Sequence, residues 1–346
     1  MAAPLPPIRP NTLITDDIEV RIVDTNEPDI FTNVRPLWGP PGGRGVYGGT
    51  IMAQCLSAAQ ETVSPSLVVS SMHCCFLLGV STDTPMVYGV ERLFDSPNAA
   101  TRSICAMQNS KTVFTASLAF RKYANQHIRD KRLHFAPAPI VHPPSTEADP
   151  DSWDASRPFE SREAYTVHPV PADEAVHKRT ILQWVRARGR IPTGRQAHLA
   201  ALAYMYDSFL LGSVSRVHRV PRYTSCAALR RLEELRGRAD PDDISTTVYL
   251  EGLARKEKME FRGLPVPGNE EVSMLVTLTH SIYIHAPAAV MAHEWLLSET
   301  HSPWSGDGRG LVIQRWWSRT GILIATCVQE GVIRLNQDTN LPETKL

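Results

Sequence analysis

The residue with the clearest chemical potential in this chain is Asp207, a carboxylate within an otherwise apolar stretch. Its neighbours in the sequence are Leu202, Ala203, Met205, Phe209 and Leu210. Burying a carboxylate is costly unless it is paired or used, and perturbed carboxylates gather at functional sites. We therefore predict that Asp207 acts as a general base or orients a reacting group. The alternative is a surface Asp at a point where the apolar pattern of a helix ends.

Two more polar side chains lie in predicted strands of the second half. Residues 272–285 alternate between apolar and polar types, which predicts that Thr277, Thr279 and Ser281 share one face of a strand. Gln329 lies among apolar neighbours, where a buried amide can donate and accept and can hold a water or a carbonyl oxygen. Taken from the residues alone, the threonines also fit ordinary strand positions, and Gln329 fits a cross-strand hydrogen bond.

A glycine-rich segment, 42–49, comes before a predicted helix that begins at Thr50. It contains GxGxxG, but Pro-rich residues precede it and no acid follows about 20 residues on, so we reject a dinucleotide site. Gly48 and Gly49 would instead let a thioester or phosphate approach the N–H groups that open the helix.

Several other chemistries are excluded by spacing. The chain has no GxSxG elbow, HExxH, paired CxxC or Walker loop, so neither a metal nor a cofactor is expected. The twelve histidines are scattered, which favours packing and surface roles. The six cysteines lie mostly in apolar segments, which favours buried thiols in a reducing compartment.

Composition excludes further classes of function. The 346 residues carry 36 Lys+Arg and 36 Asp+Glu, so the basic excess typical of nucleic-acid binders is missing. No apolar run is long enough for a membrane span. The first residues do not follow the pattern of a secretory signal, so secretion is not expected.

The order of predicted elements is the same in both halves of the chain. Each half has one apolar helix followed by about four strands, which predicts an α+β fold with two antiparallel sheets, each wrapped round a central helix. The predicted helices are 50–61 and 196–211, and the predicted strands are 66–78, 86–94, 100–108, 112–120, 272–285, 294–300, 310–317 and 322–335. His73 to Arg102 and His280 to Arg309 both span 29 residues, which suggests duplication.

These patterns divide the chain into two repeats, 15–125 and 191–336, joined by a Pro-rich connector at 126–190. Within the second repeat, 222–271 has no counterpart in the first and is rich in Arg, Glu and Asp. We predict a surface insertion outside the core, replaceable by a short Gly-Ser linker. Residues 337–346 read as a flexible tail.

The residues resemble the type II acyl-CoA thioesterases, which have a double hotdog fold. The segments that carry the resemblance are VYGGTIMAQCLSAA (46–59), the strand around His73, YGVERLFD (88–95), ATR (100–102), LAYMYD (202–207), His280-Ser281 with His285, EWLL (294–297), Arg309-Gly310 and VQEGVIR (328–334). The resemblance implies hydrolysis of acyl-CoA to a free acid and CoA, within fatty acid metabolism. It also implies that subunits associate further.

The resemblance assigns site residues by position. Asp207, Thr277 and Gln329 take the catalytic positions that hold the attacking water, and only the second repeat has them. Substrate-binding positions are expected at Gly48, Gly49, Thr50, His73 and Thr279. Thr279 stands where the family usually has Asp, which leaves a changed substrate open.

Two other functions stay open from the sequence. One is a hotdog hydratase or dehydratase, although those carry His six residues after the Asp and here that residue is Ser213. The other is an acyl-CoA-binding protein without catalysis. The last residues, Thr344-Lys345-Leu346, resemble the Ser-Lys-Leu address read by a peroxisomal import receptor, so we expect a peroxisomal location, with the cytoplasm as the alternative.

Overall fold

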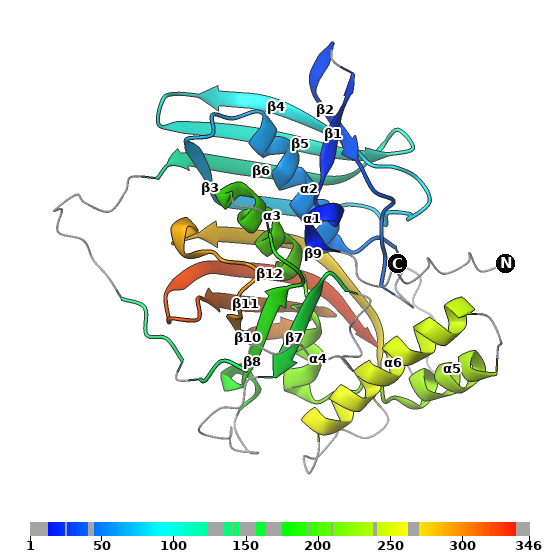
Figure 1. Cartoon of the computed structure of the whole chain (residues 1–346). Helices are drawn as coiled ribbons and strands as arrows, with labels where there is room; N and C mark the ends of the chain where they lie inside the picture. Colours follow the sequence, from blue (N-terminus) through cyan, green and yellow to red (C-terminus); the bar gives the residue numbers. More distant parts are fainter. Residues whose placement is uncertain are drawn as a thin grey trace.

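The computed structural model describes residues 13–24, 26–40, 45–123, 135–139, 141–144, 157–163, 175–191, 194–208, 210–237, 241–261 and 270–336. Within them, twelve strands form one antiparallel sheet in the order β1-β2-β4-β5-β6-β3-β9-β12-β11-β10-β8-β7 (Figure 1). The strands are β1 (Val20–Asp24), β2 (Glu27–Asn33), β3 (Leu67–Phe76), β4 (Val87–Asp95), β5 (Ala99–Gln108), β6 (Lys111–Lys122), β7 (Phe159–Glu163), β8 (Thr180–Ala187), β9 (Val272–Ile284), β10 (Leu296–Gly306), β11 (Arg309–Trp317) and β12 (Leu323–Leu335).

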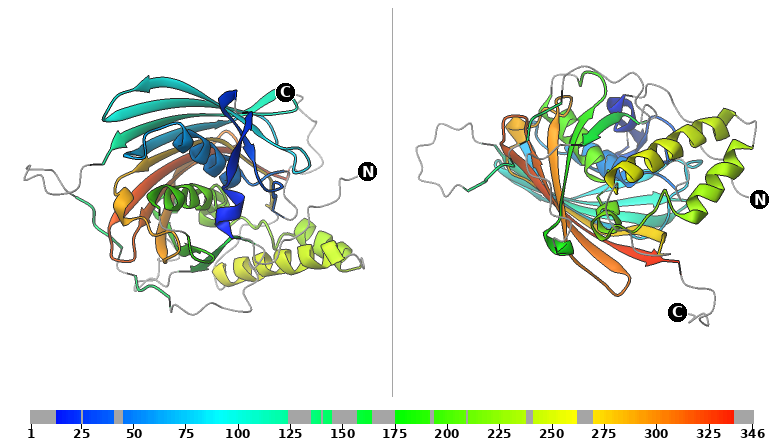
Figure 2. Two further views of the ribbon diagram at one scale, coloured as in Figure 1. Left: turned by 45° about the horizontal axis from the view of Figure 1, so that its top comes forward. Right: turned by 90° about the horizontal axis from the view of Figure 1, so that it is seen from below.

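Two helices lie inside the curve of this sheet, one from each half of the chain (Figure 2). The helices are α1 (Ile14–Asp17), α2 (Gly48–Glu61), α3 (Arg195–Tyr206), α4 (Gly212–His218), α5 (Cys226–Arg236) and α6 (Pro241–Glu260), with short 3₁₀ turns η1 (Val176–Lys178) and η2 (Pro287–Ala289). No helix among the described residues has the length and apolar character needed to cross a membrane. The arrangement is that of a double hotdog, as the sequence predicts.

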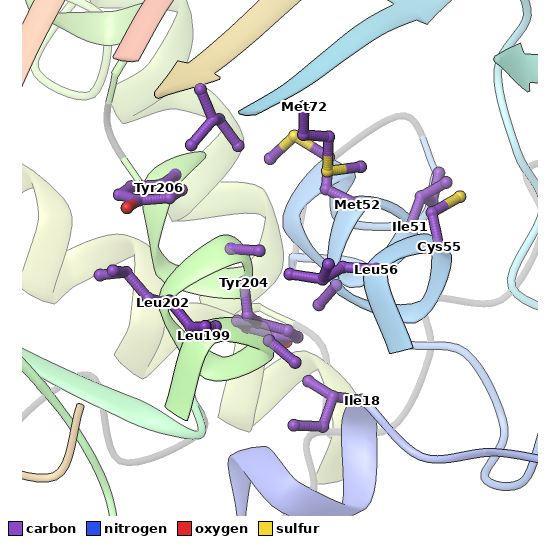
Figure 3. Close-up of a cluster of buried hydrophobic side chains, with 14 of the residues drawn as sticks. Ile18, Ile51, Met52, Cys55, Leu56, Met72, Leu199, Leu202, Tyr204 and Tyr206 are labelled. Atoms are coloured by element: carbon purple, nitrogen blue, oxygen red, sulfur yellow. The ribbon is translucent and has the colours of Figure 1, made fainter. Parts of the chain in front are cut away.

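Helices α2 and α3 pack against each other at the centre of the core. Figure 3 shows Met52 and Leu56 of α2 facing the same cluster as Leu202 and Tyr204 of α3. Both helices are buried on nearly every side because their sequences are rich in Ala, Leu and Met. Their mutual packing fixes the end of α3 relative to the start of α2.

The two repeats are related by an approximate two-fold axis. The strand order reads the same from either end, with β3 and β9 paired at the centre and His73 opposite Ser281. Each central strand carries a bulge at the equivalent place, at Ser70 in β3 and Leu278 in β9, three residues before the seam pair. Duplication is therefore visible in topology and in register.

The equal 29-residue spacing does not mark equivalent positions. His73 is exposed on the outer face, whereas His280 is completely buried on the inner face. Likewise Arg102 is completely buried and bonded to Asp95, whereas Arg309 is exposed. At the seam His73 pairs with Ser281, so the residue of the second repeat that is equivalent to His73 is Ser281 rather than His280. A shift of one residue along a strand reverses the face on which a side chain lies.

The Pro-rich connector contains two strands of the second sheet. Strand β7 pairs with β8 and β8 pairs with β10, so the second hotdog begins at Phe159 rather than at residue 191. Prolines flank these strands without entering them, which is why proline density misplaced the boundary. The sequence reading also missed β1 and β2 in the first repeat.

The insertion is more firmly packed than expected. It lies outside the sheet, as α5 and α6 beside the second hotdog (Figure 1), but α6 buries Tyr249, Leu253 and Ala254. Glu257 accepts hydrogen bonds from the backbone N–H groups of residues 222–224, at 2.7–2.9 Å. A Gly-Ser linker would expose the surfaces that these residues cover, so the packing argues against a harmless replacement.

Candidate active site

Asp207 lies directly after α3 and faces the start of α2. The sequence predicts a helix through residue 211, but α3 ends at Tyr206 and Asp207 caps it. The backbone N–H groups of Gly48 and Gly49 face the Asp207 carboxylate and act to lower its pKa. A helix N-terminus favours negative charge, so α2 of the first repeat holds the carboxylate that the second repeat supplies.

The absence of side chains at Gly48 and Gly49 is what allows this contact. A Cβ on Gly48 would lie 2.8 Å from Asp207 Oδ2 and 3.1 Å from the Phe76 ring. A Cβ on Gly49 would lie 2.2 Å from the carbonyl oxygen of Tyr204. The two glycines therefore allow the close approach of Asp207 and of α3 to the start of α2. Their contact with substrate stays a prediction.

Gln329 joins Asp207 to Thr277. Its Nε2 lies 3.0 Å from Asp207 Oδ1 and 3.0 Å from Thr277 Oγ1. The amide nitrogen carries two hydrogens, so each bond uses one of them. Because Thr277 Oγ1 accepts from Gln329, the Thr277 hydroxyl hydrogen is left to donate to another group. Asp207 comes from the residue directly after α3, Thr277 from β9 and Gln329 from β12.

The bulge at Leu278 brings Thr277 into this group. Strict alternation would place Thr277 on the same face as Thr279, but the extra residue turns Thr277 toward Gln329 on the inner face. Thr279 remains exposed on the outer face. The predicted common face for Thr277, Thr279 and Ser281 is therefore wrong, and Thr279 lies away from Asp207.

The electrostatics of Asp207 suit proton transfer near neutral pH. Desolvation by the surrounding protein raises the pKa of Asp207 from 3.8 to about 7, although hydrogen bonds from Gln329, Gly49 and Gly48 act in the opposite direction. By surface accessibility the residue as a whole is nevertheless partly exposed. A base with a pKa close to the working pH is effective in general acid–base catalysis.

The other predicted binding residues lie in different places. His73 is on the outer face, where Nδ1 is 3.0 Å from Ser281 Oγ and the ring packs edge-on against Tyr283. Thr50 is buried in the first turn of α2, where its N–H bonds to the Tyr47 carbonyl. The structure thus brings Gly48, Gly49 and Thr50 near Asp207 and leaves His73 and Thr279 outside.

Comparison with known proteins identifies the family. The acyl-CoA thioesterase C-terminal domain matches residues 137–333, and the N-terminal domain matches residues 35–121. The chain belongs to the acyl-CoA thioesterases. Acyl-coenzyme A thioesterase 8 of Mus musculus is 29% identical over 357 residues, covering 97% of this chain and 92% of the mouse protein.

Two other relatives add to this comparison. The peroxisomal acyl-coenzyme A thioester hydrolase 1 of Saccharomyces cerevisiae is 29% identical over 101 residues, covering 29% of each chain. The structure of an acyl-CoA thioesterase II from Mycobacterium marinum is 22% identical, with a TM-score of 0.60, and covers 95% of this chain and 99% of that one. The structural likeness supports the double hotdog fold.

The first repeat of this thioesterase has no counterpart of the polar group. Val69 precedes the bulge in β3 as Thr277 precedes the bulge in β9. Leu118 pairs with the residue before His73, as Gln329 pairs with the residue before Ser281. Because Val69 and Leu118 are apolar, the first repeat provides the helix start for Asp207 but lacks the side chains to bind a water.

Sequence reasoning missed the aromatic side chains around the start of α2. The Tyr47 ring lies 5.0 Å from the Tyr204 ring, and its hydroxyl donates to the Tyr204 carbonyl at 3.0 Å. Phe159 packs against both tyrosines. The sequence signal that could have indicated these aromatic contacts is the position of Tyr47 directly before Gly48. Within the described ranges, no three His, Cys, Asp or Glu side chains gather as metal ligands.

Proposed function

We propose that this chain hydrolyses acyl-CoA by direct attack of water on the thioester carbonyl, with Asp207 as the base. The observation that supports this most is the Gln329 amide, which bonds Asp207 and Thr277 at 3.0 Å each. One amide thereby sets the relative positions of a carboxylate that can accept a proton and a hydroxyl that can donate one. Family membership supports the thioesterase reaction itself.

In the proposed reaction, a water donates a hydrogen bond to Asp207 and accepts one from the Thr277 hydroxyl. Its oxygen forms a bond to the carbonyl carbon while Asp207 takes its proton. The C–S bond then breaks, the carboxylic acid forms, and the proton on Asp207 goes to the departing CoA thiolate. The backbone of Gly48 and Gly49 lowers the pKa of Asp207 and so favours the charged form of the base.

The triad can be tested by measuring CoA release from a panel of acyl-CoAs. We expect Thr277→Ala and Gln329→Ala each to lower kcat. Combining either with Asp207→Asn should add much less than the product of the single effects, because residues acting as a unit are non-additive. Fully multiplicative effects would contradict a shared role.

The same assay separates the alternatives. A hydratase or dehydratase would change the acyl group and leave the thioester intact, and a binding protein would turn nothing over. Either outcome would overturn the proposed function.

We further propose a peroxisomal location and a role in fatty acid metabolism. The support is the C-terminal Thr344-Lys345-Leu346, which lies outside the described residues, and the similarity to the yeast hydrolase named as peroxisomal. A fluorescent protein carrying residues 337–346 at its C-terminus should co-localise with a peroxisomal marker, and removal of Leu346 should abolish this. A diffuse signal from the complete tail would contradict the location.

A further inference from the structure

A buried histidine lies directly opposite Gln329, and the proposed mechanism does not use it. His280 and Gln329 are paired residues of the antiparallel strands β9 and β12, so their side chains leave the same face side by side. Both side chains are completely buried. Among the described residues, neither ring nitrogen of His280 has a hydrogen-bond partner, and Gln329 Oε1 also lacks one. Unpaired buried polar atoms are costly and call for an explanation.

The unpaired atoms are complementary in kind. Burial lowers the pKa of His280 to about 3, so its imidazole is neutral near neutral pH and carries one N–H donor and one acceptor. On Gln329 the amide nitrogen is already committed to Asp207 and Thr277, which leaves Oε1 as an acceptor. The Tyr206 hydroxyl is likewise buried and has no partner within the described part of the chain, and its ring centroid lies 6.5 Å from that of His280.

We propose that His280 is a positioning residue: a rotation of its ring would let its N–H donate to Gln329 Oε1, a bond that the structure leaves unmade, and would so fix the orientation of the Gln329 amide. The inference rests on the proposed function of Asp207 and Thr277. With Oε1 held by His280, the amide nitrogen must face Asp207 and Thr277. If the amide turned over, its oxygen would face the Asp207 carboxylate, and both observed bonds would be lost.

This role has a consequence for the pH dependence of the reaction. The Gln329 hydrogen bond favours the charged form of Asp207 and so lowers its pKa. Loss of the amide orientation should therefore raise the pKa of Asp207. Since the base acts when deprotonated, the acid limb of the kcat/KM profile should move to higher pH.

His280→Met is a suitable test because the equivalent residue of the first repeat is Met72. Met72 is buried in the central strand β3, as His280 is buried in the central strand β9. We expect kcat to fall by roughly 10- to 100-fold, as for a misplaced catalytic group, with little change in KM. The acid limb should move to higher pH. His280→Gln retains an N–H donor and should restore part of kcat and move the limb back.

A buried histidine elsewhere supplies the control. His198 lies in the first turn of α3, accepts from the Ala292 N–H at 3.1 Å, and also has a lowered pKa. His198→Met should lower Tm without moving the acid limb. If His280→Met or His280→Gln lowers Tm but leaves the limb in place, the positioning role is wrong. If Asp207→Asn keeps full activity, the proposed function itself fails, which is a separate result.

Discussion

Replacing Asp207 with Asn is expected to lower kcat for acyl-CoA hydrolysis by about 10²–10⁴, the range typical of a lost general base. Asn keeps the size, and its amide oxygen can face the N–H groups of Gly48 and Gly49 as the carboxylate does. It cannot take a proton from water. KM should change little, because the substitution removes no group that is assigned to substrate binding. CoA release by purified variants is the measurement.

The stability of the same variant separates a catalytic from a structural role. Burial raises the pKa of Asp207 from 3.8 to about 7 in the folded state. The stabilising contribution of the protonated form is complete below the unfolded pKa and is lost as pH rises through about 7. At pH 8.5 the Tm of Asp207→Asn should therefore be higher than that of wild type. A lower Tm with undiminished specific activity would point to a structural Asp.

Gly48→Ala should produce the second large loss of activity. The added Cβ would lie 2.8 Å from Asp207 Oδ2, a distance shorter than the contacts that Cβ atoms make in proteins. The carboxylate must therefore move. A displacement of a catalytic group by about 1 Å can cost about 10²-fold in rate. We expect a fall of this size in kcat, measured as CoA release under saturating acyl-CoA.

Gly79→Ala is the matched control, because a Cβ at Gly79 would meet no atom of the described residues within 4 Å. It should leave kcat and Tm close to wild type. Circular dichroism of Gly48→Ala would show whether the fold is retained. If folded Gly48→Ala keeps wild-type kcat, then the contact between α2 and Asp207 has no part in catalysis.

Much of the fold could be predicted because long periodic segments carry it. Strands β3, β4, β5, β6, β9, β11 and β12 all fall within a few residues of the predicted runs, since their alternation or β-branched content is strong. The apolar helices were also evident. Asp207 stood out because a carboxylate in such surroundings is unusual.

Other features depend on contacts that no local pattern contains. The bulge at Leu278 is a single-residue event, yet it decides that Thr277 and not Thr279 reaches Gln329. The end of α3 at Tyr206 depends on Asp207 finding partners in the other repeat. The close approach of Asp207 to Gly48 follows from packing between repeats, which no local sequence pattern contains.

The dependence of kcat/KM on pH, compared between wild type and Asp207→Asn, tests most directly whether Asp207 is the base. The wild-type profile should rise with pH through an acid limb near 7, the pKa to which burial raises Asp207. The residual activity of Asp207→Asn should lack this limb, although the substrate and its own ionisations are the same. An acid limb near 7 that persists unchanged in Asp207→Asn would contradict the assignment.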